Sequence, residues 1–368
     1  MNIVYIGRYN EGEILTGPEK VAKRIFDGAA SERKCVFIEY FFDGKKYGLA
    51  KKLFGREKVC SVNGSDVFRL GLFRILAFLI EQKPDIIHII SFERFALAAY
   101  IYRVFFNVRI VYNVHGIAVY ENKFLRKESS FRNFKDCFAE DFYIRHSDII
   151  MLLSRKFKLL FDEYYPVSSR KIRYIKNGTD KEFGNVKSKN VDTEILRIVF
   201  ISDISRPEKG FRFLKEALEE FSRSAELHVV DRKELSGEIK FKNENINLFF
   251  YDKMPAESMQ GFLYDKDIFI SAAKYEPFGM TCTECMSAGL IPVVTDVTGA
   301  SELITDGLNG FVFEFGNKEQ LNRILENLYD DPELRKSVQE EAVKIYRTVS
   351  WSEILKNYLK IYEELLRK

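Results

Sequence analysis

The sequence predicts an α/β fold of two domains, each built around a parallel sheet. The chain has 368 residues, which is enough for two separate hydrophobic cores. Residues 267–300 read as a buried strand, a loop, a helix and a second strand, the unit from which parallel sheets are assembled. The polar stretch 186–194 reads as a linker, and a new series of apolar strands starts directly after it at residues 196–201. This restart indicates a domain boundary.

The first series of elements alternates short apolar runs with longer amphipathic ones. The expected strands are residues 2–6, 35–40, 85–90, 109–114, 147–153 and 173–176. The expected helices are residues 18–30, 68–82, 92–106, the second half of 121–146, and 154–164. Pro18 fits the first turn of its helix, and Ser154 is placed to cap the helix that follows it.

The second series follows the same alternation. The expected strands are residues 196–201, 226–230, 246–250, 267–271, 291–295 and 311–313. One helix is expected directly after Lys209-Gly210. The other expected helices cover residues 280–288, 317–329, 332–348 and 350–366. We therefore place the first domain at residues 1–182, the second at 183–348, and a separate C-terminal helix at 349–368.

Composition excludes several classes of protein. Hydrophobic residues make up 46% and charged residues 30%, as in globular proteins, and the net charge of +3 does not favour a nucleic-acid partner. No apolar run reaches transmembrane length, and the N-terminal run is too short for a signal peptide. Five cysteines without such a peptide indicate reduced thiols in the cytoplasm. Cys282 and Cys285 lack a second pair, so we expect them to pack and not to bind zinc.

The segment around Glu276 and Glu284 has the chemistry of a binding site. It lies after a strand, where parallel sheets bind ligands. The first residues of the following helix, Gly279, Met280 and Thr281, would expose backbone N–H groups suited to a phosphate. Glu284 could accept hydrogen bonds from ribose hydroxyls, and Glu276 from a neutral sugar. The alternative interpretation is a loop glutamate and a solvated helix glutamate.

The residues EPFGMTCTECMSAGLIPVV resemble the E-x7-E segment of retaining nucleotide-sugar glycosyltransferases, glycosyltransferase family 4. Pro-Phe-Gly after the first Glu, including Phe278, and Ser-Ala-Gly after the second make the resemblance specific. It implies the GT-B fold, in which two Rossmann-like domains face a central cleft. It also implies that the C-terminal helix crosses back to the first domain and that residues 251–257 hold the nucleobase.

The resemblance also implies roles for residues outside this segment. His115, which follows a strand, would contact the donor sugar, and Lys209 would reach a phosphate. Arg206 stands in the same loop as Lys209, but the Gly-Arg pair usual in the family is Asp203-Ile204 here. We therefore keep a solvated cation as the alternative for Arg206. Gly17 precedes Pro18 where the family has two glycines, so a role at the diphosphate and an ordinary turn both remain open.

The function that these residues predict is transfer of a sugar, with retention, from a nucleoside-diphosphate sugar to an acceptor hydroxyl. His115, Lys209 and Glu276 would form the catalytic set, and a UDP-sugar is the favoured donor. This mechanism needs neither a metal ion nor a cofactor, because positive groups stabilise the departing diphosphate. Two alternatives are a nucleotide-sugar epimerase of the same fold and a non-catalytic nucleotide-sugar-binding protein.

Two segments suggest the acceptor side. Residues 45–58 mix six Lys or Arg residues with Tyr47, Leu49, Leu53 and Phe54, and residues 124–145 are also basic and aromatic. Such a pattern suits an anionic membrane surface, and a solvated face is the alternative. The expected partner is a glycan or lipid-linked acceptor in polysaccharide biosynthesis. The expected location is the cytoplasm, peripheral on the inner face of the membrane.

Overall fold

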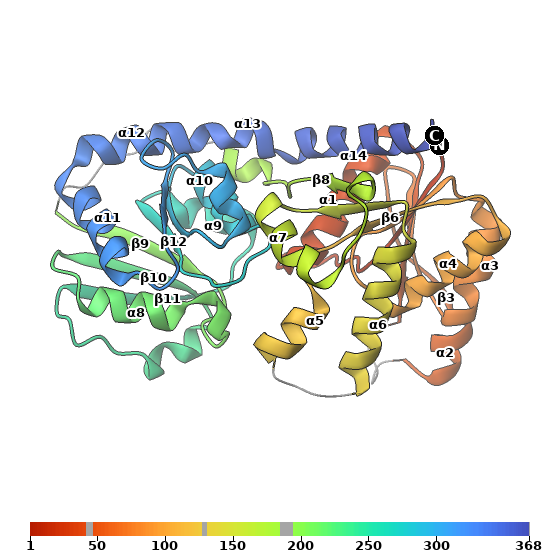
Figure 1. Cartoon of the computed structure of the whole chain (residues 1–368), viewed down its shortest axis with the longest axis horizontal. Coiled ribbons are helices and arrows are strands. Elements are labelled where there is room, and N and C mark those ends of the chain that lie inside the picture. Colours follow the sequence, from red (N-terminus) through yellow and green to blue (C-terminus); the bar gives the residue numbers. More distant parts are fainter. Residues whose placement is uncertain (42–46, 127–130, 185–193, 368) are drawn as a thin grey trace. The chain divides into compact units, whose positions relative to one another are not determined.

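The computed structural model describes residues 1–41, 47–126, 131–184 and 194–367 (Figure 1). The chain forms two compact units. The N-terminal unit comprises Met1–Leu153, Lys158–Lys176 and Trp351–Lys368, and the C-terminal unit comprises Ser154–Phe157 and Asn177–Ser350. The C-terminal helix therefore belongs to the N-terminal unit. Residues 186–193 of the predicted linker and parts of the two basic, aromatic segments lie outside the described residues.

The N-terminal unit is built on one sheet, which has eight strands within the described residues. Its strands are β1 (Ile3–Ile6), β2 (Val36–Tyr40), β3 (Arg56–Val62), β4 (Ser65–Leu70), β5 (Ile86–Ile89), β6 (Arg109–Asn113), β7 (Ile149–Leu152) and β8 (Ile172–Tyr174). The order is β3-β4-β2-β1-β5-β6-β7-β8, and every pairing is parallel except that of β3 with β4. Strand order reverses direction between β1 and β5.

The helices of this unit lie between its strands in sequence, except α14, which follows the C-terminal unit. They are α1 (Gly17–Glu32), α2 (Leu49–Phe54), α3 (Leu72–Gln82), α4 (Leu97–Phe105), α5 (Ala118–Tyr120), α6 (Phe131–His146), α7 (Arg155–Tyr164) and α14 (Trp351–Leu366). The first residues of α7 belong to the C-terminal unit. Ser154 caps α7 as predicted, because its Oγ accepts from the Phe157 N–H at 3.0 Å.

The predicted helix over residues 68–82 is wrong at its start. Residues 68–70 belong to β4, which forms a hairpin with β3, and α3 begins only after Gly71. The hairpin turns at Asn63 and Gly64, whose φ angles of 48° and 77° lie in the left-handed region. Asn-Gly is the strongest short hairpin signal in a sequence. The apolar residues of β4 are followed almost directly by those of α3. The sequence pattern therefore does not show where the two-residue period of a strand changes to the 3.6-residue period of a helix.

Helix α14 is held to the N-terminal sheet by a buried polar chain. The Tyr362 hydroxyl donates to His88 Nδ1 at 2.7 Å, and His88 Nε2–H donates to Asn113 Oδ1 at 2.9 Å. The Asn113 amide in turn donates to the Tyr358 hydroxyl at 2.7 Å. Burial lowers the pKa of His88 to about 3, so the ring is neutral with one donor and one acceptor. The chain links β5 and β6 to residues more than 200 positions later.

The C-terminal unit holds a second sheet, all parallel, of six strands in its described part. Its strands are β9 (Leu196–Ile201), β10 (Ala225–Asp231), β11 (Ile246–Asp252), β12 (Ile268–Ser271), β13 (Ile291–Thr295) and β14 (Phe311–Phe313). The order is β11-β10-β9-β12-β13-β14, so strand order reverses between β9 and β12. All six predicted strands are confirmed.

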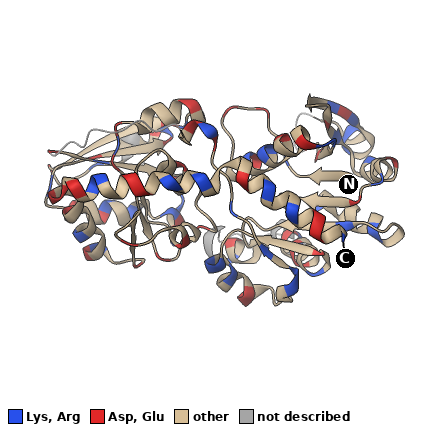
Figure 2. Cartoon of the chain, turned by 90° about the horizontal axis from the view of Figure 1, so that it is seen from above, with Lys and Arg blue, Asp and Glu red and all other residues tan. Residues whose placement is uncertain are grey.

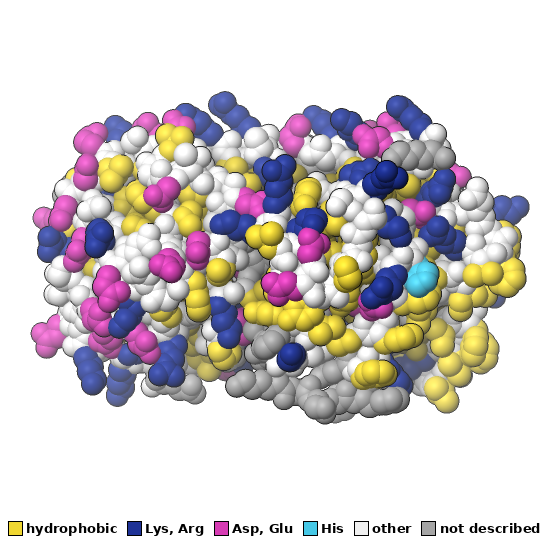
Figure 3. Space-filling model, viewed as in Figure 1, with side chains coloured by type: hydrophobic (Ala, Val, Ile, Leu, Met, Phe, Trp, Pro, Cys, Tyr) yellow, Lys and Arg dark blue, Asp and Glu magenta, His cyan; other side chains and the backbone are white. Residues whose placement is uncertain are grey.

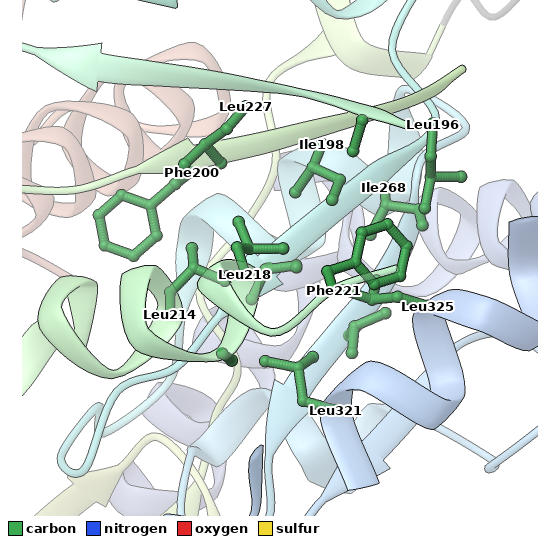
Figure 4. Close-up of a cluster of buried hydrophobic side chains, with 14 of the residues drawn as sticks. Leu196, Ile198, Phe200, Leu214, Leu218, Phe221, Leu227, Ile268, Leu321 and Leu325 are labelled. Atoms are coloured by element: carbon green, nitrogen blue, oxygen red, sulfur yellow. The ribbon is translucent and has the colours of Figure 1, made fainter. Parts of the chain in front are cut away.

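Helices and short turns cover this second sheet. The helices are α8 (Phe211–Glu219), α9 (Ala256–Leu263), α10 (Met280–Ser287), α11 (Lys318–Asp330), α12 (Pro332–Ala342) and α13 (Tyr346–Val349). Figure 4 shows one side of the core, where α8 and α11 meet the sheet. Leu214 and Leu218 of α8 and Leu321 and Leu325 of α11 are fully buried there, packed with strand residues such as Ile198. This packing holds the ends of β9 and β12 in place.

Acidic and basic residues are interspersed along the helices and loops of both units (Figure 2). Along α14, Lys356 donates to Glu353 at 2.6 Å, a pair one helical turn apart. None of the described helices combines the length and the apolar composition needed to cross a membrane.

Candidate functional site

A small pocket lies at the point of the C-terminal sheet where the strand order reverses. It has a volume of about 70 Å³. The lining residues come from the carboxyl ends of β9 and β12, the start of α10 and the turn after β13: among them are Ser202, Lys209, Ser271, Glu276, Gly279, Thr281, Thr298 and Ala300. Open α/β sheets bind ligands at this position. A volume of 70 Å³ suits one small group of a ligand and not a whole nucleotide.

An ion pair lies at this pocket. Lys209 Nζ donates to Glu276 Oε2 at 2.6 Å, and the two side chains are 19% and 26% exposed. The partners are far apart in sequence, on the loops after β9 and β12. The bond is charge-assisted and directs each side chain toward the pocket. A cation and a carboxylate in contact can receive a phosphate and a hydroxyl side by side.

The loop that carries Lys209 is pressed against the end of β12. Gly210 follows Lys209 with a φ of +77°, and a Cβ at this position would lie 1.9 Å from the Ala272 carbonyl oxygen. Only glycine allows both the left-handed backbone and this approach. Lys274 N also donates to the Glu208 carbonyl at 2.9 Å, which ties the two loops together. The position of Lys209 therefore depends on the glycine after it.

The Glu276 loop is held by the turn after β13. The Gly299 N–H donates to the Glu276 carbonyl at 2.9 Å, and the Ser154 hydroxyl donates to the Pro277 carbonyl at 2.9 Å. Gly279 then caps α10 with a φ of 91°, and its carbonyl accepts from Cys282 at 3.0 Å. The N–H groups of Met280 and Thr281, in the first turn, have no partner within the helix by its geometry. They supply a partial positive charge beside Lys209.

Phe278 and both cysteines of the motif are packing residues. Phe278 is 2% exposed, and Cys282 and Cys285 lie in a hydrophobic cluster with Met286 and Val294. Burial raises the pKa of the Cys282 thiol well above its usual range, so this sulfur stays protonated and is a poor metal ligand. Phe278 is not among the residues that line the pocket.

Three other predicted residues lie near this pocket but do not line it. Met280 and Glu284 are half-buried on α10, and Glu284 stands about one turn further along the helix than the pocket residue Thr281. Arg206 Nε donates to Glu208 Oε1 at 2.6 Å, and its side chain is 49% exposed. This pairing holds the Arg206 guanidinium beside a buried carboxylate.

Ser202 and Thr298 were not singled out in the sequence. Ser202 follows β9 directly, and Thr298 pairs with Glu276 as an isolated parallel bridge. The signal for Ser202 was its place at the carboxyl end of a predicted strand. Thr298 had no comparable signal, because its contact with Glu276 joins two loops.

His115 and Gly17 belong to the N-terminal unit. His115 follows β6, and its Nε2–H donates to the Ile90 carbonyl at 2.7 Å. Burial lowers the pKa of His115 to about 4, so the ring is neutral and its Nδ1 is an acceptor. Gly17 is the first residue of α1, where Glu19 accepts from the Thr16 N–H at 3.0 Å as in a capping box.

Within the residues that the structure describes, no three His, Cys, Asp or Glu side chains gather as a metal site would require. Asp265 and Asp267 flank Lys266 at a spacing that could share a cation. However, Asp267 Oδ2 accepts from the Arg197 N–H at 2.9 Å, and Asp265 pairs with Lys266. Each carboxylate is thus engaged by the protein itself.

Two family models match the chain in succession. Residues 54–183 match the model described as Glycosyltransferase Family 4, and residues 185–345 match the model described as Glycosyl transferases group 1. An uncharacterized glycosyltransferase of Methanocaldococcus jannaschii is 26% identical over 235 residues. That alignment spans 60% of this chain and 66% of the relative.

Solved structures of glycosyltransferases share the complete fold. Sucrose-phosphate synthase from Thermosynechococcus elongatus matches with a TM-score of 0.77 at 13% identity, covering 100% of this chain and 99% of the other. Anabaena HepE, solved with UDP and glucose, matches with a TM-score of 0.72 at 16% identity, covering 99% and 100%. At these identities the likeness shows the fold, which confirms the predicted GT-B class. With both family models, it establishes that the chain belongs to the group 1 glycosyltransferases, glycosyltransferase family 4.

Proposed function

We propose that the chain transfers a sugar from a nucleoside-diphosphate sugar to an acceptor hydroxyl with retention of configuration. The observation that carries the proposal is the contact of Lys209 with Glu276 at the start of α10. A UDP-sugar is the proposed donor, and the structural likeness to HepE with UDP supports this choice. The alignment with the Methanocaldococcus relative covers 66% of that protein, so the activity is proposed from the site and not from the relative.

The proposed chemistry depends on stabilising the leaving diphosphate. Lys209 and the N-terminus of α10 supply positive charge where the bond between the sugar C1 and the phosphate oxygen breaks. The acceptor oxygen bonds to C1 from the same face, and its proton passes to the departing phosphate oxygen. Glu276 holds a sugar hydroxyl in this scheme and forms no covalent bond. No metal ion or cofactor takes part.

The remaining assignments extend the same scheme. Glu284 holds the ribose hydroxyls, and the neutral His115 accepts from a donor-sugar hydroxyl through Nδ1. Gly17 and Arg206 are assigned to the diphosphate. The Arg206 assignment requires its guanidinium to leave Glu208, which accepts from it at 2.6 Å.

We also propose a membrane-bound or lipid-linked acceptor in polysaccharide biosynthesis, with the enzyme peripheral on the inner face of the membrane. Figure 3 shows hydrophobic side chains gathered over the part of the N-terminal unit that holds α2, α3 and α4. Phe54 and Phe73 are 64% and 60% exposed there and stack at 5.3 Å, and Phe105 is 74% exposed. Exposed apolar groups beside Lys51 and Arg103 support docking on an anionic lipid surface.

The donor site is tested by removing its charges one at a time. Lys209→Ala and Glu284→Ala should each weaken UDP-glucose binding or turnover at least about tenfold, the loss of one charged hydrogen bond. Lys215→Ala is the matched control, because Lys215 pairs with Glu219 on the same segment but lies outside the pocket. Binding is measured by thermal shift with UDP-glucose. Unchanged affinity and turnover in both site variants would exclude this site.

The reaction products distinguish the two catalytic alternatives. A transferase releases UDP from UDP-glucose at a rate that depends on an acceptor, whereas an epimerase yields a changed sugar still attached to UDP. Chromatography of the nucleotide products separates these outcomes. A protein that binds UDP-glucose without any product, with lipid extracts or without them, would be a binding protein only.

A further inference from the structure

The two ends of the long segment of the C-terminal unit are hydrogen-bonded to each other. The chain enters this segment at Asn177 and leaves it after Ser350. The Thr179 N–H donates to the Val349 carbonyl at 2.7 Å, and Thr179 pairs with Ser350 as an isolated parallel bridge. Thr179 and Val349 are both fully buried. The backbone of Thr179 is therefore held in place by the other end of the segment.

A buried relay of hydroxyl groups connects Thr179 to the start of α10. Thr179 Oγ1 donates to Thr283 Oγ1 at 3.1 Å, and Thr283 Oγ1 donates to the Met280 carbonyl at 2.8 Å. Thr283 is fully buried, like Thr179. A hydroxyl has one proton to donate, so this hydroxyl relay runs in one direction, from Thr179 to the Met280 carbonyl.

The hydroxyl relay ends on a peptide group that belongs to the donor site. The Met280 carbonyl and the Thr281 N–H are parts of one planar trans peptide, in which they point in opposite directions. Thr281 lines the pocket that also contains Lys209 and Glu276. A bond that fixes the direction of the Met280 carbonyl therefore also fixes the direction of the Thr281 N–H.

The Thr179 hydroxyl acts on the side chain of Thr283 in two ways. A threonine in a helix divides between two rotamers, and only a hydroxyl turned toward the preceding turn can bond a carbonyl there. The bond from Thr179 stabilises the rotamer in which Thr283 reaches the Met280 carbonyl. Hydrogen bonds in a chain also polarise one another, so an accepting carbonyl makes the N–H of its own peptide a stronger donor. The relay therefore orients and strengthens the Thr281 N–H.

Packing alone does not require this pair of hydroxyls. Replacing both partners of a buried hydrogen bond by apolar groups of the same shape can be nearly neutral for stability. Two valines would fill the same space as Thr179 and Thr283. The presence of two hydroxyls that point along one path to the donor pocket favours a role in that site.

We propose that Thr179 is a positioning residue of the donor site: through Thr283 it orients the Thr281 N–H toward the diphosphate of the nucleotide sugar. The inference rests on the proposed donor and adds a residue to its site. Thr179 itself touches no substrate in this scheme. Because the Val349 carbonyl holds Thr179, the diphosphate contact also depends on the pairing of the two ends of the segment.

The test measures the binding of UDP to the whole chain by titration calorimetry. Thr179→Val removes the hydroxyl and keeps the shape of the side chain, whereas Thr179→Ser keeps the hydroxyl. Thr283→Val interrupts the same relay at α10 and serves alone if Thr179→Val does not fold. Thr348→Val is the matched control, because the Thr348 hydroxyl donates to the Ile345 carbonyl at 3.0 Å and Thr348 is exposed.

Thr179→Val and Thr283→Val should each weaken UDP binding about three- to tenfold, the loss of one buried hydrogen bond. The double variant should bind no more weakly than Thr283→Val, because both changes interrupt one relay. Thr179→Ser and Thr348→Val should stay within about twofold of the wild type. Full affinity in Thr179→Val, an equal loss in Thr179→Ser, or losses that multiply in the double variant would overturn the proposal.

A measurement without nucleotide separates this proposal from the proposed function. NMR with isotope-labelled threonine observes the Thr281 amide, whose resonance is assigned as the one missing from Thr281→Ser. This resonance should move in Thr179→Val and stay in place in Thr348→Val. An unmoved Thr281 amide would overturn the relay whatever UDP does. Absence of UDP binding to the wild type would refute the proposed function, and the Thr281 amide then decides the relay alone.

Discussion

Glu140 on α6 is buried and holds two hydrogen bonds through one oxygen. Its Oε2 accepts from the Ala118 N–H at 2.8 Å and from the Tyr165 hydroxyl at 2.6 Å. Burial raises the pKa of Glu140 from 4.5 to about 7, against the opposing effect of these hydrogen bonds. The folded state therefore keeps a proton that the unfolded state releases at lower pH. Stability from this group is present below pH 4.5 and is lost as the pH rises to about 7.

Glu140→Gln should reverse this loss. The amide oxygen can accept the same two bonds, so the variant becomes more stable relative to wild type as the pH rises from 5 to 8. The change is at most about 3 kcal/mol, from 1.36 kcal/mol per pKa unit. Melting temperatures of both proteins across this range measure it. His88 and His115 have lowered pKa values, so they make the stability rise with pH. Both proteins contain these histidines, so subtracting the wild-type stability from that of the variant cancels their effect.

Glu163→Gln provides the control for this experiment, because Glu163 is exposed on α7 and its replacement should leave the difference flat. A difference between Glu140→Gln and wild type that does not change with pH would show that Glu140 ionises normally in the folded protein.

At the scale of elements, the β3–β4 hairpin is specified by its turn. Gly64 has a φ of +77°, and a Cβ there would meet no atom within 4 Å. Gly64→Ala should therefore destabilise the N-terminal unit by about 1 kcal/mol through backbone strain alone. The midpoint of urea unfolding measures the loss.

The same substitution should have the opposite sign at Gly261, which lies exposed within α9 with open space around it. Gly261→Ala should stabilise by about 0.5–1 kcal/mol, because alanine is the better helix former. Equal effects of the two substitutions would show that the turn does not impose the left-handed backbone at Gly64.

At the scale of the whole molecule, α14 completes the N-terminal unit from the far end of the chain. Ending the chain after Ser350 would expose the polar chain of His88 and Asn113 and remove the packing of α14. The N-terminal unit should unfold at lower temperature, while the C-terminal unit, whose described residues end at Ser350, keeps its transition.

Calorimetry resolves the two transitions. Tyr362→Phe is the milder variant, expected to cost about 1–2 kcal/mol because His88 Nδ1 loses its donor. A truncation that lowers both transitions equally would contradict the assignment of α14 to one unit.

The proposed membrane surface is formed by residues of several helices of the N-terminal unit. Each exposed basic residue contributes about 1 kcal/mol at an anionic surface, and salt screens this within about 8–10 Å. The wild type should co-sediment with anionic vesicles at low salt and less with neutral ones. The double variant Phe54→Ser/Phe73→Ser should lose binding, and Phe315→Ser, on an exposed phenylalanine of the C-terminal unit, should keep it. Negligible binding to both kinds of vesicle would contradict the proposed membrane surface and would favour a soluble acceptor.

The sequence by itself determined the contiguous parts of this protein. The strand–loop–helix–strand unit around Glu276 was predicted because each piece has its own period and the glycines mark its ends. The resemblance in that segment identified the family and the GT-B fold for the same reason, since all its residues lie within one short stretch. The approach of Gly210 to Ala272, which positions Lys209, could not be predicted, because it joins two loops.

Only the tertiary structure decided contacts between distant segments. The pairing of Lys209 with Glu276 and of Glu39 with Arg69 depends on which strands are neighbours and in which register, and periodicity within one strand carries no such information. The hairpin was not predicted because the apolar residues of β4 and α3 form one run in the sequence, and the boundary between strand and helix cannot be seen in it. The bond from Thr179 to Thr283 joins residues that lie 104 positions apart, so only folding brings the two hydroxyls together.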